Sequence, residues 1–177
     1  MTGLWLLFLV RRIPTRIRIS ERKDIRWIST AGVSLLWMGA VVLLLSRWQP
    51  GTYLALELVW ALPPILLQLA LGADILWHYR RLVGVALLTT TLYLSAADLL
   101  AIHSGTWTIN PERSLGLLLG GILPVEEVVF FLLTNTLLVF GLVLALANAS
   151  LYRLSRPFGR RLSPAGRTRD LEQPLKM

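Results

Sequence analysis

Four apolar stretches, each long enough to cross a lipid bilayer, constrain this sequence more than any other feature. They are residues 27–48, 53–72, 82–102 and a longer region at 115–149. A membrane-crossing helix needs roughly 20 mostly apolar residues. The fourth region is too long for one straight helix and is interrupted at Gly120, Gly121 and Pro124. We therefore expect a short lead-in segment at 115–123 and a crossing helix at 124–149 that has Pro124 in its first turn.

These stretches predict an all-α fold, a polytopic integral membrane helix bundle of about four transmembrane helices. Only helices or closed barrels satisfy their backbone groups in lipid, and the apolar runs are too long for strands. The composition agrees, because 55% of the residues are hydrophobic and 16% are charged, against about 25% charged residues in soluble proteins. So apolar a chain is not intrinsically disordered. The absence of cysteine excludes a disulfide-stapled module and a cysteine-ligated metal site.

The N-terminus carries a shorter apolar run at residues 4–10, followed at once by Arg11 and Arg12. Seven residues cannot span a membrane, and a signal peptide places its positive charge before the apolar run. The same order, apolar and then basic, occurs at the C-terminal end of the last span. We therefore interpret residues 4–10 as the remnant of a transmembrane helix whose beginning is missing, with a surface-lying anchor as the alternative.

The basic residues predict the orientation in the membrane. The net charge is +8, and 16 of the 18 lysines and arginines lie in segments 11–26, 80–81 and 153–176. With four crossings these segments fall on one side, so the positive-inside rule places both termini in the cytoplasm, with the chain in the cell (inner/cytoplasmic) membrane. No aromatic-rich RNA-binding motif accompanies them. We therefore expect the lipid bilayer, with its anionic lipids, as their partner and no nucleic acid.

The acidic residues lie in less expected places. Six of the ten lie in or beside the spans: Glu57, Asp74, Asp98, Glu112, Glu126 and Glu127. A charge at mid-bilayer costs at least ~2.5–3.5 kcal/mol, so such residues are functional candidates by default. Glu57 and Asp98 each lie four residues inside the non-cytoplasmic face, a depth of roughly 6 Å. We expect Glu126 and Glu127 at a similar or somewhat greater depth, so that three helices bring carboxyl groups to one level.

Each acid also has a purely structural interpretation. Glu57 can extend to the interface, Asp74 can join an interfacial ion-pair group with His78, and Glu112 can be solvated in its loop. The adjacent pair Glu126 and Glu127 is hardest to explain in this way, because neighbouring helical residues point about 100° apart. The two side chains therefore cannot easily both turn away from lipid unless each has a polar partner.

A carboxylic acid in an apolar site favours its protonated form, which suits proton donation to an alkene or a proton relay. Aromatic rings can stabilise a carbocation through their π faces, although ordinary packing is the alternative for each ring. The candidates are Trp60, Tyr93, Trp107, Phe130 and Phe131. Other chemistries lack their motifs: there is no glycine-rich nucleotide loop, no HExxH and no GxSxG. Both lysines lie outside the spans, so no intramembrane lysine can form a retinal Schiff base.

Five short motifs together carry a family resemblance. They are Tyr53-Leu54 with Leu62-Pro63-Pro64, Gly72-Ala73-Asp74, Leu92-Tyr93-Leu94 with Ala97-Asp98, the loop Gly105-Thr106-Trp107-Thr108-Ile109-Asn110-Pro111-Glu112, and Leu123-Pro124-Val125-Glu126-Glu127 with Phe130-Phe131. In this pattern residues 52–147 resemble a lycopene cyclase domain of the heterodimeric, non-flavin type. The last string is similar to the Pro-Ile/Leu-Glu-Glu signature of that family and is its most specific piece.

The resemblance implies an architecture of two homologous three-helix repeats, either as two subunits or fused in one chain. Residues 27–48 resemble the helix that joins the repeats, and residues 2–14 resemble the end of the first repeat. The implied domains are 1–26 (helix remnant and basic cytoplasmic linker), 27–48 (linker helix), 52–149 (cyclase domain) and 150–177 (basic tail, expected to be disordered). A homologous first repeat or a homo-oligomer is the implied partner, unless the chain is a truncated product or its true start lies upstream.

The resemblance also implies an activity, the redox-neutral cyclisation of the ψ-ends of lycopene by a lycopene β-cyclase or one half of one. Glu126 and Glu127 would perform the acid–base work, with Asp98 as orienter or second acid. The residues implied to bind the carotenoid substrate are Tyr93, Trp107, Phe130 and Phe131. This isomerisation requires no cofactor and no metal.

Three alternatives remain at this stage. The chain could be a subunit of a cyclase for C50 carotenoids, which members of the family also cyclise. It could be a non-catalytic membrane partner whose acids serve packing or assembly. A transporter is disfavoured, because four spans without paired broken helices do not match the usual transporter repeats.

Overall fold

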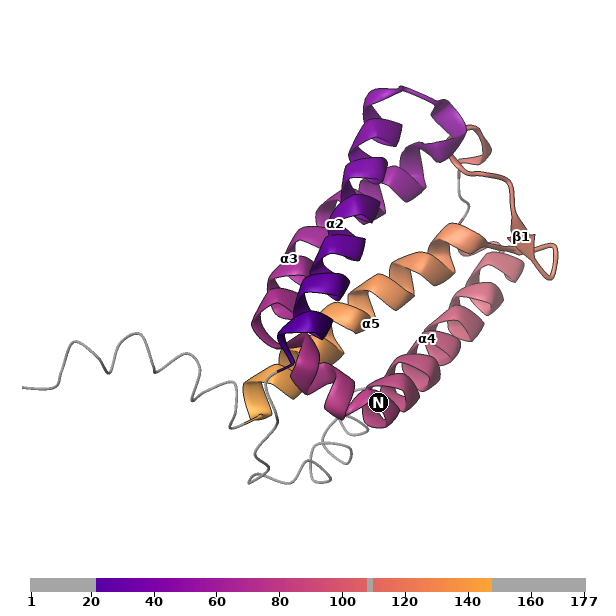
Figure 1. Cartoon of the computed structure of the whole chain (residues 1–177). Helices are drawn as coiled ribbons and strands as arrows, with labels where there is room; N and C mark the ends of the chain where they lie inside the picture. The colour runs from indigo at the N-terminus through magenta and orange to yellow at the C-terminus, as the bar shows by residue number, and fades with distance from the viewer. Residues whose placement is uncertain (1–21, 108–109, 148–177) are drawn as a thin grey trace, which may run out of the picture.

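Four long helices dominate the computed structural model, which describes residues 22–107 and 110–147 (Figure 1). They are α2 (Lys23–Leu45), α3 (Thr52–His78), α4 (Arg80–His103) and α5 (Val125–Leu146). Each is long and apolar enough to cross a membrane. The all-α membrane-bundle prediction is therefore confirmed for the described part of the chain. The expected N-terminal helix remnant and C-terminal tail lie outside the described residues.

The four helices begin and end close to the predicted spans, with two differences. Helix α3 continues to His78, beyond the expected end at residue 72, although its backbone is non-helical at Gly72 (φ −161°, ψ 35°). Helix α5 begins at Val125, so Pro124 precedes the first turn as the N-cap residue. Short 3-10 turns, η1 (Gln49–Gly51) and η2 (Pro111–Arg113), lie in the connections.

The segment before α5 is a small hairpin. Strand β1 (Leu118–Leu119) pairs antiparallel with β2 (Leu123–Pro124). Gly120 and Gly121 have φ values of 61° and 72°, a left-handed conformation that glycine adopts without a steric penalty. The lead-in segment expected at 115–123 is therefore a tight reversal of the chain. It returns the backbone to the N-terminal end of α5.

Helix α5 packs against both α3 and α4, whereas α3 and α4 have little contact with each other. In Figure 1, α5 accordingly lies between α4 and the α2–α3 pair. The buried core lies mainly on α3 and α5 and includes Ala61, Leu62, Ile65, Leu69, Leu133, Val139, Val143 and Leu144. Helix α5 is therefore the element that holds the bundle together.

Helix α2 packs along α3 and bonds to a carbonyl that α3 cannot satisfy itself. In a regular helix the carbonyl of Val59 accepts from the backbone N–H of residue 63, but Pro63 has no N–H. The indole N–H of Trp37 donates to the Val59 oxygen instead, at 3.1 Å. The proline that breaks the hydrogen-bond ladder of α3 thus creates an attachment point for α2.

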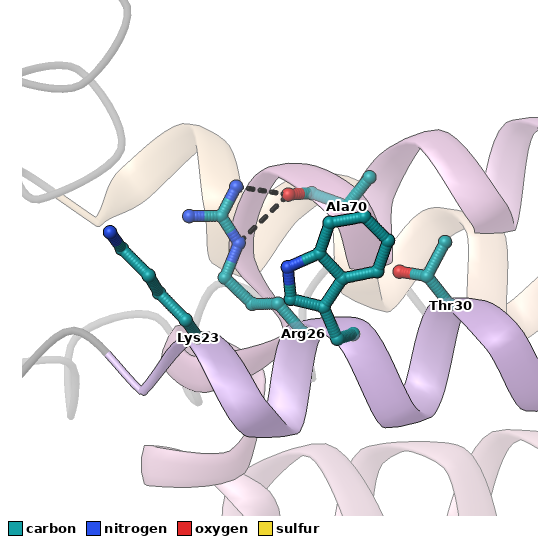
Figure 2. Close-up of a pocket in the computed structure, with 5 residues that line it drawn as sticks. Lys23, Arg26, Thr30 and Ala70 are labelled. Atoms are coloured by element: carbon teal, nitrogen blue, oxygen red, sulfur yellow. Dashed lines mark hydrogen bonds between the residues drawn. The ribbon is translucent and has the colours of Figure 1, made fainter.

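A second attachment lies near the kink at Gly72. The guanidinium of Arg26 donates from Nε to the carbonyl oxygen of Ala70 at 2.9 Å and from Nη2 to the same oxygen (Figure 2). Arg26 and Trp37 are eleven residues apart on α2, and their acceptors Ala70 and Val59 are eleven residues apart on α3. The two bonds therefore specify one antiparallel register between α2 and α3.

Replacement of Trp37 by phenylalanine tests the first attachment. The Trp37→Phe variant keeps an aromatic ring but leaves the Val59 carbonyl without its donor. We expect the free energy of unfolding to fall by about 1–3 kcal/mol, the cost of a buried polar group left unpaired, measured by unfolding of the purified protein in mixed micelles. Trp27→Phe is the matched control, because Trp27 is 76% exposed on the same helix. An equal loss in both variants would contradict the assignment.

Candidate active site

Four carboxyl groups converge where α3 begins, α4 ends and α5 begins. Glu57 comes from α3, Asp98 from α4, and Glu126 and Glu127 from the first turn of α5. All four side chains are buried, with exposed fractions of 3%, 4%, 0% and 9%. Glu57 lies within electrostatic range of Glu126 and Glu127, and Glu127 within range of Asp98. The structure thus brings the three acids predicted as catalytic together with a fourth.

Glu126 is held by two donors from the segment before the hairpin. The hydroxyl of Ser114 donates to Glu126 Oε1 at 2.9 Å, and the backbone N–H of Leu115 donates to the same oxygen at 2.6 Å. Its other oxygen, Oε2, is buried without a partner among the described residues. The side chain also lies at the positive end of the α5 dipole, which favours a negative charge. Glu126 is therefore placed as a hydrogen-bond acceptor with one oxygen free.

Glu127 accepts one hydrogen bond from the opposite helix. The phenol of Tyr53 donates to Glu127 Oε1 at 3.0 Å. Tyr53 and Glu57 are four residues apart on α3, so they project from the same face of the helix. That face points toward the N-terminal end of α5, which brings Glu57 close to both glutamates of the Pro-x-Glu-Glu string.

Glu57 and Asp98 differ from this pair because they lack donors. Neither oxygen of either side chain has a hydrogen-bond partner within residues 22–107 and 110–147. The indole of Trp107 lies beside the Asp98 carboxyl, but no well-aligned hydrogen bond joins them. Because the Glu57 side chain is buried, it does not extend to the interface, which was the structural alternative that its position in the sequence allowed.

Aromatic rings follow the acids along α5. Phe130 and Phe131 lie one helical turn after Glu126 and Glu127, and their ring centroids are 5.7 Å apart. Trp60 of α3 lies 6.5 Å from Phe130, measured between ring centroids. The structure thus places two of the predicted substrate residues next to the acids, and Trp107 next to Asp98.

Tyr93 is not brought into this group. It is 58% exposed and lies on the opposite side of α4 from the buried Thr91 and Ser95, because two residues along a helix correspond to a rotation of about 200°. Within the described part of the chain it makes no ring contact with the other predicted substrate residues.

Helix α4 also presents a buried polar face that sequence reasoning missed. Thr91, Ser95 and Asp98 are spaced by one turn each and are all buried. Asn135 of α5 donates from Nδ2 to the Thr91 hydroxyl at 3.2 Å. In membranes such polar side chains join helices to one another, and their spacing of three to four residues was the signal available in the sequence.

The two remaining acids lie apart from the cluster. Asp74 is buried near the far end of α3, 17 residues from Glu57, which corresponds to roughly 25 Å along a helix. Glu112 is exposed in η2, where its backbone N–H donates to the Asn110 side chain. In the described segments, no three histidine, aspartate or glutamate side chains are arranged to hold a metal ion.

Comparison with known proteins points to one enzyme class. The chain is 38% identical over 144 residues to the lycopene beta-cyclase of Halobacterium salinarum, an alignment that covers 81% of this chain and 59% of that protein. It is 35% identical over 148 residues to the bifunctional lycopene cyclase/phytoene synthase of Gibberella fujikuroi, covering 78% and 24%. The corresponding protein of Podospora anserina is 45% identical over 94 residues, covering 52% and 16%.

No protein-family model matches the chain, and no solved structure matches it significantly. The chain spans about three fifths of the length of the Halobacterium proteins that it matches, and about a quarter or less of the fungal proteins named here. Over most of its own length the chain is nevertheless homologous to curated lycopene cyclases, which confirms the resemblance carried by its motifs.

Proposed function

We propose that this chain is the acid-bearing part of a lycopene β-cyclase. The observation that carries the proposal is the cluster of four buried carboxyl groups at the junction of α3, α4 and α5. It occurs in a chain whose relatives are named lycopene cyclases. Two of the four carboxyls belong to the Pro-x-Glu-Glu string, and aromatic rings follow one turn later on the same helix.

The reaction needs an acid and a base but no redox step. A proton is added to C2 of the terminal C1=C2 bond of the ψ-end, which leaves a tertiary cation at C1. The electrons of the C5=C6 bond attack C1, so the C1–C6 bond closes a six-membered ring and the cation moves to C5. Loss of the proton on C6 restores the C5=C6 bond and gives a β-ring. Substrate and product are isomers.

The described residues offer each part that this chemistry requires. Glu126 and Glu127 provide the acid–base pair, and Asp98, beside Trp107, serves as orienter or second acid. Phe130 and Phe131 provide π faces that stabilise a carbocation. Burial keeps water from the cation, which would otherwise be trapped as an alcohol.

We also propose that a homologous first repeat, or a second copy of this chain, completes the enzyme. This proposal is supported by the two-repeat architecture that the sequence motifs of residues 52–147 imply. The carotenoid substrate would then be bound between the acid cluster and the partner.

Substitution of the Pro-x-Glu-Glu acids tests the catalytic proposal. We expect Glu126→Gln and Glu127→Gln each to lower β-ring formation by at least about a hundredfold, the usual contribution of a general acid or base. β-Carotene would be measured in lycopene-accumulating cells that also express a first repeat. Glu112→Gln is the matched control, because Glu112 is exposed in η2 and lies outside the cluster.

The outcomes separate the candidate functions. Full activity of the double variant Glu126→Gln/Glu127→Gln would contradict a catalytic role for this chain and favour a non-catalytic subunit. Cyclised product from this chain alone would exclude the need for a different partner. Cyclised product that forms only after a first repeat is added would support the need for a partner.

Membrane topology can be tested because the chain contains no cysteine. We propose that the turn at Arg80 and Arg81 faces the cytoplasm with both termini, as the distribution of basic residues predicts. Ser104→Cys should therefore react with an impermeant maleimide in intact cells, whereas Arg81→Cys should react only after permeabilisation. Both positions are exposed at opposite ends of α4. The reverse labelling pattern would contradict this orientation.

A further inference from the structure

Glu57 is the acid of the cluster whose hydrogen bonding differs most from that of Glu126. Its side chain is 3% exposed, and neither of its oxygens has a hydrogen-bond partner among the described residues. A buried carboxylate without donors or a counter-charge is far more costly than the neutral acid. Glu57 is therefore the kind of group that holds a proton in this site.

Glu126 has the opposite environment. It accepts from the Ser114 hydroxyl and the Leu115 N–H, and it lies in the first turn of α5. Donated hydrogen bonds and the positive end of a helix dipole both stabilise a carboxylate. Its Oε2 atom, buried without a described partner, remains available to take up a proton.

The other two acids fit these roles less well. Glu127 already accepts from the Tyr53 phenol. Asp98 has the indole of Trp107 beside its carboxyl, and its ionisable neighbours are Glu127 and Tyr53 rather than Glu126. Glu57 is within electrostatic range of both Glu126 and Glu127.

We propose that Glu57 is the proton donor of the cyclisation and that Glu126 is the proton acceptor. This inference rests on the proposed function and changes one assignment within it: Glu57, rather than Glu127, forms the acid–base pair with Glu126. The Glu57 carboxyl gives its proton to C2 of the ψ-end, and Glu126 Oε2 removes the proton from C6 after the C1–C6 bond has formed. Transfer of a proton from Glu126 back to Glu57 restores both groups, so no proton is gained or lost in the cycle.

The two roles predict different products when each acid is replaced by its amide. Without the donor no cation forms, so Glu57→Gln should lower all cyclised products by at least about a hundredfold. Without the acceptor the C5 cation still forms, so the residual product of Glu126→Gln should shift from β-rings to rings that have lost a proton from C4 or from the C5 methyl group. Pigment analysis in the lycopene-accumulating host with a first repeat measures both effects.

Two further variants keep this test decisive. Glu57→Asp retains a carboxyl group and should keep more activity than Glu57→Gln, whereas Glu112→Gln should match the wild type. Membrane yield and unfolding temperature check that each variant is folded. If folded Glu57→Gln still forms β-rings at the wild-type rate, or if Glu126→Gln abolishes every ring type while Glu57→Gln changes only the ring type, the assignment is overturned.

A spectroscopic measurement separates failure of this assignment from failure of the proposed function. The infrared C=O stretch of protonated carboxyls should be present in the wild-type chain, weaker in Glu57→Gln by the contribution of Glu57, and unchanged in Glu126→Gln. Persistence of the full band in Glu57→Gln would overturn the role of Glu57 without any assay of activity. If the wild type forms no cyclised carotenoid with any first repeat, the proposed function fails, while the infrared result still decides whether Glu57 holds a proton.

Discussion

The structure depends on one constraint, the need to satisfy every backbone polar group without water. In lipid an unpaired carbonyl costs several kcal/mol, so long helices are the natural solution for this chain. Helix α3 breaks that solution at Pro63 and bends at Gly72. Trp37 and Arg26 of α2 donate to the carbonyls of Val59 and Ala70, which lie one turn before Pro63 and two residues before Gly72. The irregularities of α3 thus determine how α2 is attached.

The availability of hydrogen-bond donors also distinguishes the four buried carboxyl groups from one another. Four acids share one buried site, but only Glu126 and Glu127 accept hydrogen bonds from described residues. The donors to Glu126 come from the segment that the Gly120–Gly121 hairpin folds back over α5. A buried site with donors for some acids and none for others can hold carboxylate and neutral acid side by side. Acid–base catalysis within one pocket requires this difference.

Much of the candidate site follows from local spacing. The Pro-x-Glu-Glu string begins a helix, and Phe130 and Phe131 lie one turn later, so their proximity to the acids is predictable from the helical period. The predicted level of Glu57 and Asp98 near one face agrees with the structure, in which both lie within electrostatic range of Tyr53 and Glu127. The donors were not predictable in this way. Tyr53 lies 74 residues from Glu127, and Ser114 lies 12 residues from Glu126 across a hairpin.

The sequence by itself determined the number of spans, the all-α fold and the unusual concentration of acids, because hydropathy and charge are local properties of a helix. Only the tertiary structure decided that residues 115–123 form a hairpin, that α5 lies between α3 and α4, and that Tyr93 lies away from the acids. It also decided which carboxyls receive donors. Hydrogen bonds between distant segments depend on how the helices pack, and that arrangement is not encoded in the period of any single helix.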